Sequence, residues 1–286
     1  MYKFGPIIKE IRLAKGLKSK DVYHNLVTRA TAVRFEKGSS DTTMEKFFVI
    51  INRLNITLEE FDFIAREKES IDKLFINQLY QAFYTNNEEK IEQLKDSLLA
   101  EYTHQSNVKY LHYHIVSQLL LDELRGMTTS TKYVNKLRDY LLTCDVWGYY
   151  EIMLFTNTII FYHEELIDAL YKEAKKTLLL YSDMRMYKNE IAILLMNIIE
   201  AKIQKGSIAS ASYYLGELES IRLHTLDNMY IQSMTKYFGE LLTIIKSEHM
   251  DLKNIKYIID FLDFLGLDKK KQQCEELLNK VLAEKG

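Results

Sequence analysis

The sequence is poor in the residues that interrupt helices and in those that cross-link chains. Its 286 residues include one proline, Pro6, and only 10 glycines. Because proline breaks a helix interior, a chain without proline after residue 6 can run helix after helix. The two cysteines, Cys144 and Cys274, are too few for a disulfide framework in a chain of this size. Together with the many Leu, Ile, Lys and Glu residues, these scarcities predict an all-α fold.

The chain also lacks the sequence features of secreted, membrane-bound and catalytic proteins. The N-terminus has no apolar signal-peptide core, and no apolar run approaches the ~18 residues that a membrane-spanning helix needs. A cytoplasmic location without membrane contact is therefore expected. There is no glycine-rich nucleotide loop and no Cys/His set with metal-ligand spacing. We expect no catalytic residue, no cofactor and no metal, so that the protein is not an enzyme.

Charge is distributed unevenly along the chain, although the net charge is only −2. Residues 1–58 carry 11 Lys and Arg against 5 Asp and Glu, whereas the remainder carries 27 against 35. A basic head on an acidic body is expected of a DNA-binding domain joined to a sensing domain. The alternative is ordinary scatter of surface charge. The first interpretation is favoured because the basic part coincides with the motif that follows.

Residues 17–38 have the pattern of two short helices joined by a tight turn, as in a helix-turn-helix. The flanking pattern predicts five helices, over about 5–15, 19–25, 28–37, 41–54 and from 57 onward. Thr28 is the expected N-cap of the third helix, since its hydroxyl can accept a backbone N–H. Asp41 or Thr42 is the expected cap of the fourth.

This arrangement resembles the phage-repressor (Xre-type) helix-turn-helix domain. The resemblance covers about residues 4–63 and is strongest in 11–17, 34–38 and 54–61. The usual glycine of the turn is missing and Leu26-Val27 leave the turn one residue short, which leaves the register of the third helix open. The resemblance implies a structural ion pair between Arg12 and Glu36 that holds the first helix to the third.

Two arginines on the third helix are the candidate base readers. Arg29 lies at its start, where side chains reach into the major groove, and Arg34 lies five residues later. The planar guanidinium matches O6 and N7 of guanine, a contact worth roughly 1–3 kcal/mol of discrimination. Pairing with phosphates is the alternative for each arginine. The residues expected to contact phosphates are Lys18, Ser19, Lys20, Thr28, Thr31, Lys37 and Ser39.

From residue 71 onward the predicted helices recur in pairs. The first helix of each pair is expected to start near residues 71, 108, 148, 187, 228 and 269, a period near 40. This period is typical of an α-solenoid, somewhat longer than the tetratricopeptide unit of 34 residues. The charged stretch at 65–70 separates a helix-turn-helix domain, residues 1–66, from a tetratricopeptide-like solenoid, residues 71–286.

The period aligns polar and aromatic side chains on the first helices. Two sets of residues repeat at intervals of 40: Tyr150, Glu190 and Tyr230 in one, and Asn157, Asn197 and Tyr237 in the other. Because stacked first helices line the concave side of a solenoid, these six residues predict a groove. Asparagine offers one acceptor and two donors, which can pair with the N–H and C=O of an extended peptide. The alternative is that these are helix-surface polar groups or core tyrosines satisfied locally.

Over essentially its whole length the chain resembles the Rgg/MutR regulators of streptococci and related Gram-positive bacteria. Residues 28–41, 147–157 and 236–241 carry this resemblance. It implies a homodimer that binds double-stranded promoter DNA through the head, and a short hydrophobic signalling peptide, imported for quorum sensing, in the groove of the repeats. RNA polymerase is a further candidate partner. The alternative is a repeat domain that serves only as a dimerisation and protein-docking scaffold, with no peptide ligand.

Overall fold

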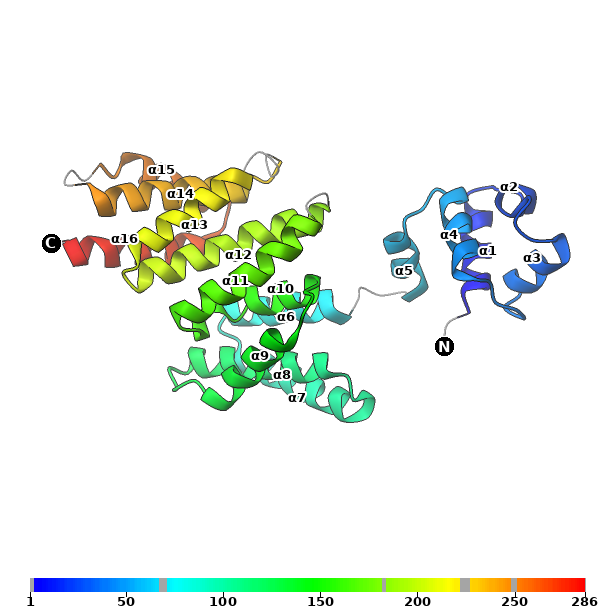
Figure 1. The fold of residues 1–286 in the computed structure, drawn as a ribbon, viewed down its shortest axis with the longest axis horizontal. Helices are drawn as coiled ribbons and strands as arrows, with labels where there is room; N and C mark the ends of the chain where they lie inside the picture. The colour runs from blue at the N-terminus through cyan, green and yellow to red at the C-terminus, as the bar shows by residue number, and fades with distance from the viewer. Residues whose placement is uncertain (1–2, 67–70, 182–183, 222–226, 248–250, 286) are drawn as a thin grey trace. The chain divides into compact units, whose positions relative to one another are not determined.

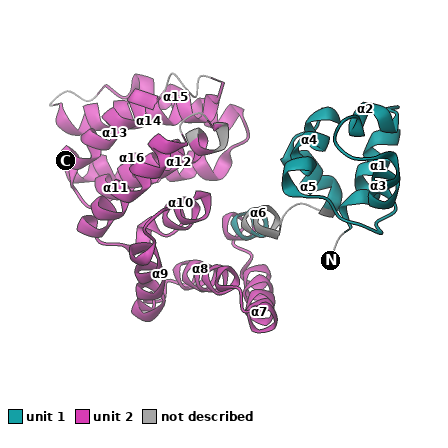
Figure 2. Cartoon of the chain, turned by 45° about the vertical axis from the view of Figure 1, so that its right-hand side comes forward, with its two compact units in different colours: residues 1–81 teal, residues 82–286 magenta. Residues whose placement is uncertain are grey.

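The computed structural model describes residues 3–66, 71–181, 184–221, 227–247 and 251–285, where its regular structure is entirely helical (Figure 1). The predicted all-α fold class is confirmed. The chain divides into two compact units, residues 1–81 and 82–286 (Figure 2). Residues 67–70, the centre of the expected junction, lie outside the described residues. The division falls in the next helix, α6 (Ile71–Tyr84).

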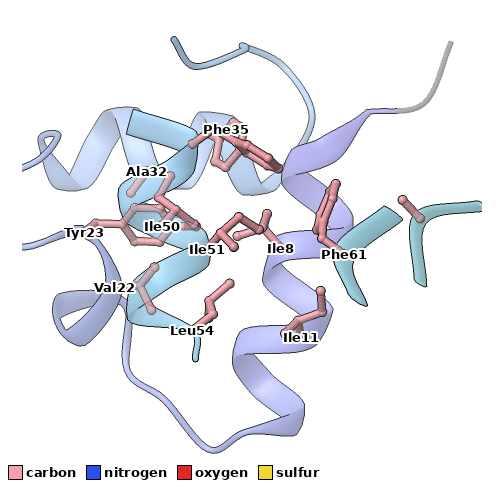
Figure 3. Close-up of a cluster of buried hydrophobic side chains, with 12 residues drawn as sticks. Ile8, Ile11, Val22, Tyr23, Ala32, Phe35, Ile50, Ile51, Leu54 and Phe61 are labelled. Carbon is pink, nitrogen blue, oxygen red and sulfur yellow. The ribbon is translucent and has the colours of Figure 1, made fainter. Parts of the chain in front are cut away.

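Five short helices form the head, which we define as residues 3–66: α1 (Phe4–Ala14), α2 (Ser19–Tyr23), α3 (Arg29–Glu36), α4 (Met44–Arg53) and α5 (Leu58–Arg66). Their apolar sides meet in one cluster, in which Ile8, Phe35, Ile50 and Leu54 are buried (Figure 3). Burying each such side chain contributes about 1.5–3 kcal/mol. Gly5 allows α1 and α3 to approach closely, because a Cβ there would lie 1.7 Å from the carbonyl oxygen of Phe35.

Threonine hydroxyl groups cap α3 and the helix that follows it, α4. As predicted, Thr28 caps α3, and its Oγ1 accepts a hydrogen bond from a backbone N–H at 3.2 Å. The prediction for the fourth helix is wrong. Thr43, rather than Asp41 or Thr42, caps α4 and accepts a backbone N–H at 3.4 Å. All three residues can cap a helix, and α4 starts only at Met44.

The turn between α2 and α3 has an asparagine where the family pattern has a glycine. Asn25 adopts the left-handed conformation with φ of 58°, which asparagine tolerates better than most residues with a Cβ. The backbone N–H groups of Leu26 and Val27 both bond to the carbonyl of Tyr23, at 3.0 and 3.3 Å. This turn sets the register that the sequence left open, and α3 begins at Arg29.

Ten α-helices and one short 3-10 helix follow α6 in the described residues: α7 (Glu88–Gln105), α8 (Val108–Leu124), α9 (Thr131–Thr143), α10 (Tyr149–Thr156), η1 (Ile159–Phe161), α11 (Glu164–Leu180), α12 (Arg185–Gln204), α13 (Ile208–Ile221), α14 (Met229–Lys246), α15 (Lys253–Phe264) and α16 (Asp268–Lys285). The first helices of successive pairs begin at residues 71, 108, 149, 185, 229 and 268. Each start lies within two residues of its predicted position. The period of about 40 residues is therefore confirmed.

First helices of neighbouring pairs pack on one another in the repeat unit, which we define as residues 82–286. The packing joins α10 to α12, α12 to α14 and α14 to α16. Hydrogen bonds cross these contacts at about the same interval: the Tyr149 hydroxyl donates to Glu190 at 3.4 Å, and the Asn197 amide donates to the Thr156 carbonyl at 3.1 Å. The repeat length thus determines which side chains meet across the stack.

Candidate functional site

Helix α3 presents one face to the core of the head and the other to solvent. Ala32, Phe35 and Glu36 are buried, whereas Arg29 and Arg34 are exposed. The two predicted base readers therefore both stand on the free side of a helix that the core holds in place. A guanidinium in this position is available to a base edge or a phosphate without any loss of packing.

A buried ion pair holds α3 to α1, as the resemblance implied. Arg12 Nε donates to Glu36 Oε1 at 2.7 Å and Arg12 Nη2 donates to Glu36 Oε2 at 2.9 Å. Arg12 Nη1 also donates to the carbonyl of Leu17 at 2.8 Å, which ties the loop before α2 to the same pair. Burial raises the pKa of Glu36, but the hydrogen bond from Arg12 and the positive charges of Arg12 and Lys9 together outweigh burial, so the pKa lies below its ordinary value. The pair thus stays charged at neutral pH and fixes the orientation of α3.

The residues predicted to contact phosphates lie at both ends of α3. A shallow hollow of about 450 Å³ beside its start is lined by Lys18, Ser19, Lys20, Tyr23, His24, Asn25, Val27 and Arg29. Lys18 and Lys20 are exposed and Ser19 is half-buried. This hollow therefore brings three of the predicted phosphate contacts next to Arg29. Lys37 and Ser39 are exposed beyond the other end of α3.

The hydroxyl groups in this set also serve the helix ends. Thr28 Oγ1 lies 2.9 Å from Thr31 Oγ1, and Ser39 Oγ donates to the carbonyl of Arg34 at 3.2 Å. Each hydroxyl has capacity for one more hydrogen bond, because a hydroxyl combines one donor with two acceptor positions. A phosphate contact is compatible with these local bonds.

Sequence reasoning missed two small apolar residues on the outer face of α3. Val33 is 43 % exposed and lies one turn after Arg29, and Ala30 is exposed one turn before Arg34. Apolar side chains of this size contact the methyl group of thymine in the major groove. The signal was available in the sequence, since an apolar residue four positions from Arg29 shares its helix face.

Five of the six side chains predicted to line a groove are half-buried: Tyr150, Glu190, Asn197 and Tyr230 on first helices of the repeat unit, and Asn157 directly after the end of α10. The hydroxyl of Tyr150 lies 2.8 Å from Nδ1 of His112 on the preceding first helix. The side chain of Asn157 makes no hydrogen bond to the described residues, whereas Asn197 uses one amide hydrogen on the carbonyl of Thr156. Both asparagines retain polar capacity for a ligand.

The groove role predicted for Tyr237 is wrong. Its side chain is wholly buried, and its hydroxyl donates to the carbonyl of Cys274 at 2.7 Å. The ring belongs to the contact between α14 and α16, where it has no surface to offer a ligand. The interpretation as a core tyrosine satisfied locally holds for this residue.

Lys270 of α16 is the fourth member of the set that begins with Tyr150, Glu190 and Tyr230, because it lies 40 residues after Tyr230. Its ammonium group lies 3.6 Å from Glu200 Oε2 on α12, and its side chain is 21 % exposed. Lys270 is not among the predicted groove residues, although one further step of the same period identifies it. We refer to these four residues as the period-40 column.

Burial is the main cause of the pKa shifts of Glu190 and of His112, which lie in or beside the period-40 column. Burial raises the pKa of Glu190 above its ordinary value. Burial lowers the pKa of His112 to about 4, and the ammonium of Lys136 adds to that effect. The ring of His112 lies against Tyr140, with 4.4 Å between ring centroids. His112 is therefore a neutral core residue at physiological pH.

Two features of other protein classes are absent from the described residues. No helix among them combines the length and the hydrophobicity needed to cross a membrane. No three His, Cys, Asp or Glu side chains among them come together as a metal site would require. The candidate recognition surfaces in the described residues are the outer face of α3 and the face formed by the first helices.

Comparison with known proteins connects these features. Residues 92–276 match the family model of the C-terminal domain of the HTH-type transcriptional regulator Rgg. A transcriptional regulator from Listeria monocytogenes EGD-e is similar in structure, with 25 % identity, a TM-score of 0.85 and coverage of 99 % of this chain and 98 % of its own.

Two pheromone receptors share the fold. The SHP pheromone receptor Rgg2 of Streptococcus dysgalactiae has a TM-score of 0.77 at 18 % identity, over 97 % of this chain and 99 % of its own. A bacterial peptide pheromone/receptor complex has a TM-score of 0.70 at 16 % identity, over 99 % of both chains. The family match covers well over half of the sequence, and the chain belongs to the Rgg family of helix-turn-helix transcriptional regulators.

Proposed function

We propose that this protein is a sequence-specific DNA-binding transcription regulator controlled by a short imported signalling peptide. The observation that carries the proposal is the outer face of α3. Two arginines, Arg29 and Arg34, are exposed on a helix whose orientation is fixed by the buried Arg12–Glu36 pair. Membership of the Rgg family supports the same function.

The head reads DNA through α3 in this proposal. Arg29 and Arg34 donate to guanine edges, and Val33 contacts a thymine methyl group. Phosphate contacts from Lys18, Ser19, Lys20, Thr28, Thr31, Lys37 and Ser39 set the position of the helix. The protein acts as a homodimer, so that two heads meet half-sites about one helical turn, ~34 Å, or a multiple of it apart.

The repeat unit binds a short hydrophobic peptide on the face of its first helices. Asn157 and Asn197 pair with the peptide backbone, and Tyr150, Glu190 and Tyr230 contact it beside them. The half-burial of these five residues supports this proposal, as does the fold shared with pheromone receptors. A peptide that prefers one of two dimer arrangements changes DNA binding in proportion to that preference.

The proposal also covers the domain boundary, the cellular location and the partners of the protein. We place a domain boundary between residues 66 and 71, the regulator in the cytoplasm, and RNA polymerase among its candidate partners. The alternative function keeps the DNA-binding head but makes residues 71–286 a dimerisation and docking scaffold without a peptide ligand. A peptide-binding titration separates the two.

The first experiment captures bound fragments of the host's own genomic DNA at two salt concentrations. It compares the wild type with a variant that carries Arg29→Ala and Arg34→Ala. Sharp enrichment of a few promoters, lost in the variant, would support a sequence-specific regulator. Weak, salt-sensitive binding without sequence preference would contradict it, because phosphate contacts alone give that behaviour.

The second experiment titrates the full-length protein with peptides encoded by small reading frames beside the enriched promoters. Asn197→Ala should weaken peptide binding and leave basal DNA binding intact. Asn279→Ala is the matched control, because Asn279 is exposed elsewhere on α16. Equal peptide affinity in the wild type and in both variants would exclude Asn197 from the peptide site. Absence of any peptide binding would favour the scaffold.

A further inference from the structure

Lys270 is a half-buried cation whose polar contacts in the described residues are long. Its Nζ donates to Gln273 Oε1 at 3.3 Å and lies 3.6 Å from Glu200 Oε2. A charge-assisted hydrogen bond between ammonium and carboxylate is normally about 2.7–2.9 Å long. An ammonium group has three donors. The contacts of Lys270 therefore leave donor capacity for another acceptor.

Tyr230, on the adjoining first helix α14, offers a second donor through its hydroxyl. Tyr230 is half-buried on α14, and its hydroxyl makes no hydrogen bond to the described residues. Burial raises the pKa of Tyr230, and the nearby ammonium of Lys270 partly offsets that rise. An ammonium and a hydroxyl with free donor capacity thus lie on two first helices, α16 and α14, that pack on one another.

The neighbouring lysine fixes the start of α16. Lys269 Nζ donates to the carbonyl of Tyr84 at 3.1 Å and lies 5.4 Å from the ring centroids of Phe83 and Tyr84. Lys269 thus binds to the end of α6. The helix turn that carries Lys270 is therefore anchored, and its ammonium is presented to a ligand without a large rearrangement.

We propose that Lys270 and Tyr230 bind the C-terminal carboxylate of the regulatory peptide. The inference rests on the proposed function, because it assigns one end of that same ligand. A hydrophobic peptide has few charged groups besides its termini, and a carboxylate accepts from an ammonium and a hydroxyl together. Lys270 gives up its long contact with Glu200 when the carboxylate binds. The peptide then runs with its C-terminus at α16 and its preceding residues toward Asn197 and Asn157.

The test uses the immobilised full-length protein and a pool of randomised apolar peptides. The peptides have about eight residues, enough extended chain to cross three or four packed helices. One half of the pool carries a free C-terminal carboxylate and the other a C-terminal amide. We expect the free acids to be retained roughly tenfold or more over the amides, as charge-assisted hydrogen bonds allow. A pool acetylated at the N-terminus should be retained as well as the unblocked pool.

Single substitutions test which residues produce the preference for the free carboxylate. Lys270→Met should bring the ratio of acid to amide close to one, and Lys270→Arg should keep much of it. Lys271→Met is the matched control, since Lys271 also lies on α16 but pairs with Asp263 of α15 at 2.8 Å. Glu200→Gln should act in the opposite direction and raise the ratio, because it removes the competing carboxylate. Circular dichroism verifies that each variant is folded.

The outcomes separate this inference from the proposed function. Retention of neither pool would overturn both. Equal retention of acids and amides by the wild type would overturn only the carboxylate site, as would an unchanged ratio in a folded Lys270→Met variant. Loss of retention on N-terminal acetylation would mean that the site binds the peptide N-terminus, and would also overturn the carboxylate site.

Discussion

The head and the repeat unit hold their functional side chains in opposite ways. In the head, Arg29 and Arg34 are exposed, and the groups that position them are buried beneath α3. In the repeat unit, Glu190 and Asn197 are themselves half-buried and bonded to residues of the neighbouring helix. In the proposed function, the head therefore separates support from recognition, whereas the repeat unit uses the same residues for both.

This difference has a consequence for regulation. A ligand that meets the exposed face of α3 leaves the core of the head unchanged. A ligand that competes for Glu190 or Asn197 must alter bonds that join one repeat to the next. Binding in the repeat unit is therefore coupled to its internal packing, which is the requirement for a two-state response to a ligand.

The largest effect should come from breaking the support of the head. Arg12→Ala leaves the Glu36 carboxylate buried without its partner, which costs about 3–5 kcal/mol. We expect the head to unfold at a lower denaturant concentration and DNA binding to fall in parallel. Chemical denaturation monitored by circular dichroism measures the change.

Lys15→Ala is the control for that experiment. Lys15 lies on an exposed part of the same segment and bonds to the carbonyl of Asn55 at 3.1 Å. Its loss should change stability by less than about 1 kcal/mol. If Arg12→Ala is no more destabilising than Lys15→Ala, the buried pair does not support α3.

The next largest effect should be a loss of stability of the repeat unit in acid. The pKa of His112 is lowered to about 4 in the folded repeat unit, whereas an unfolded histidine titrates near 6.5. Between these values the unfolded chain binds more protons, so the repeat unit loses stability as the pH falls from about 6.5 toward 4. The slope is at most about 1.4 kcal/mol per pH unit.

Thermal unfolding between pH 7 and pH 5 tests this expectation in the wild type and in His112→Gln. The variant removes the proton acceptor, so its melting temperature should depend less on pH than that of the wild type. His163→Gln is the control, because His163 is exposed. A wild type and a His112→Gln variant with identical pH profiles would mean that His112 is already protonated or accessible in the folded state.

Local chemistry explains which parts of the fold the sequence predicts. The repeat helices start where a period of 40 residues places them, and Thr28 caps α3 because its hydroxyl precedes the helix by one position. The competition among Asp41, Thr42 and Thr43 was not decided by local chemistry. All three residues can cap, and Thr43 does so because it directly precedes Met44, where α4 begins.

Side-chain direction in the repeat unit is harder to predict than helix position. Tyr230 and Tyr237 are two turns apart on one helix, so the sequence treats them alike. In the structure, Tyr230 is half-buried beside Lys270, whereas Tyr237 is sealed between α14 and α16. The direction in which α16 crosses α14 decides this difference, and a helical period contains no information about that crossing.

Removing one predicted base contact should have a smaller effect, which is confined to DNA recognition and leaves the support of the head intact. Arg29→Ala should weaken binding to the cognate operator by about 1–3 kcal/mol and relax the preference at one base pair, while the head remains folded. Fluorescence anisotropy with the operator and with its single-base variants measures both effects. An equal loss on operator and scrambled DNA would assign Arg29 to a phosphate instead.

The smallest effect should come from a phosphate contact at the far end of α3. Lys37 is exposed, and Lys37→Ala should weaken binding to all sequences about equally. It should also reduce the slope of log K against log salt by about one, since one fewer counterion is released. Lys46→Ala, on α4, should leave the slope unchanged. If Lys37→Ala instead changes base preference, the boundary between support and recognition in the head does not run where the exposure of α3 places it.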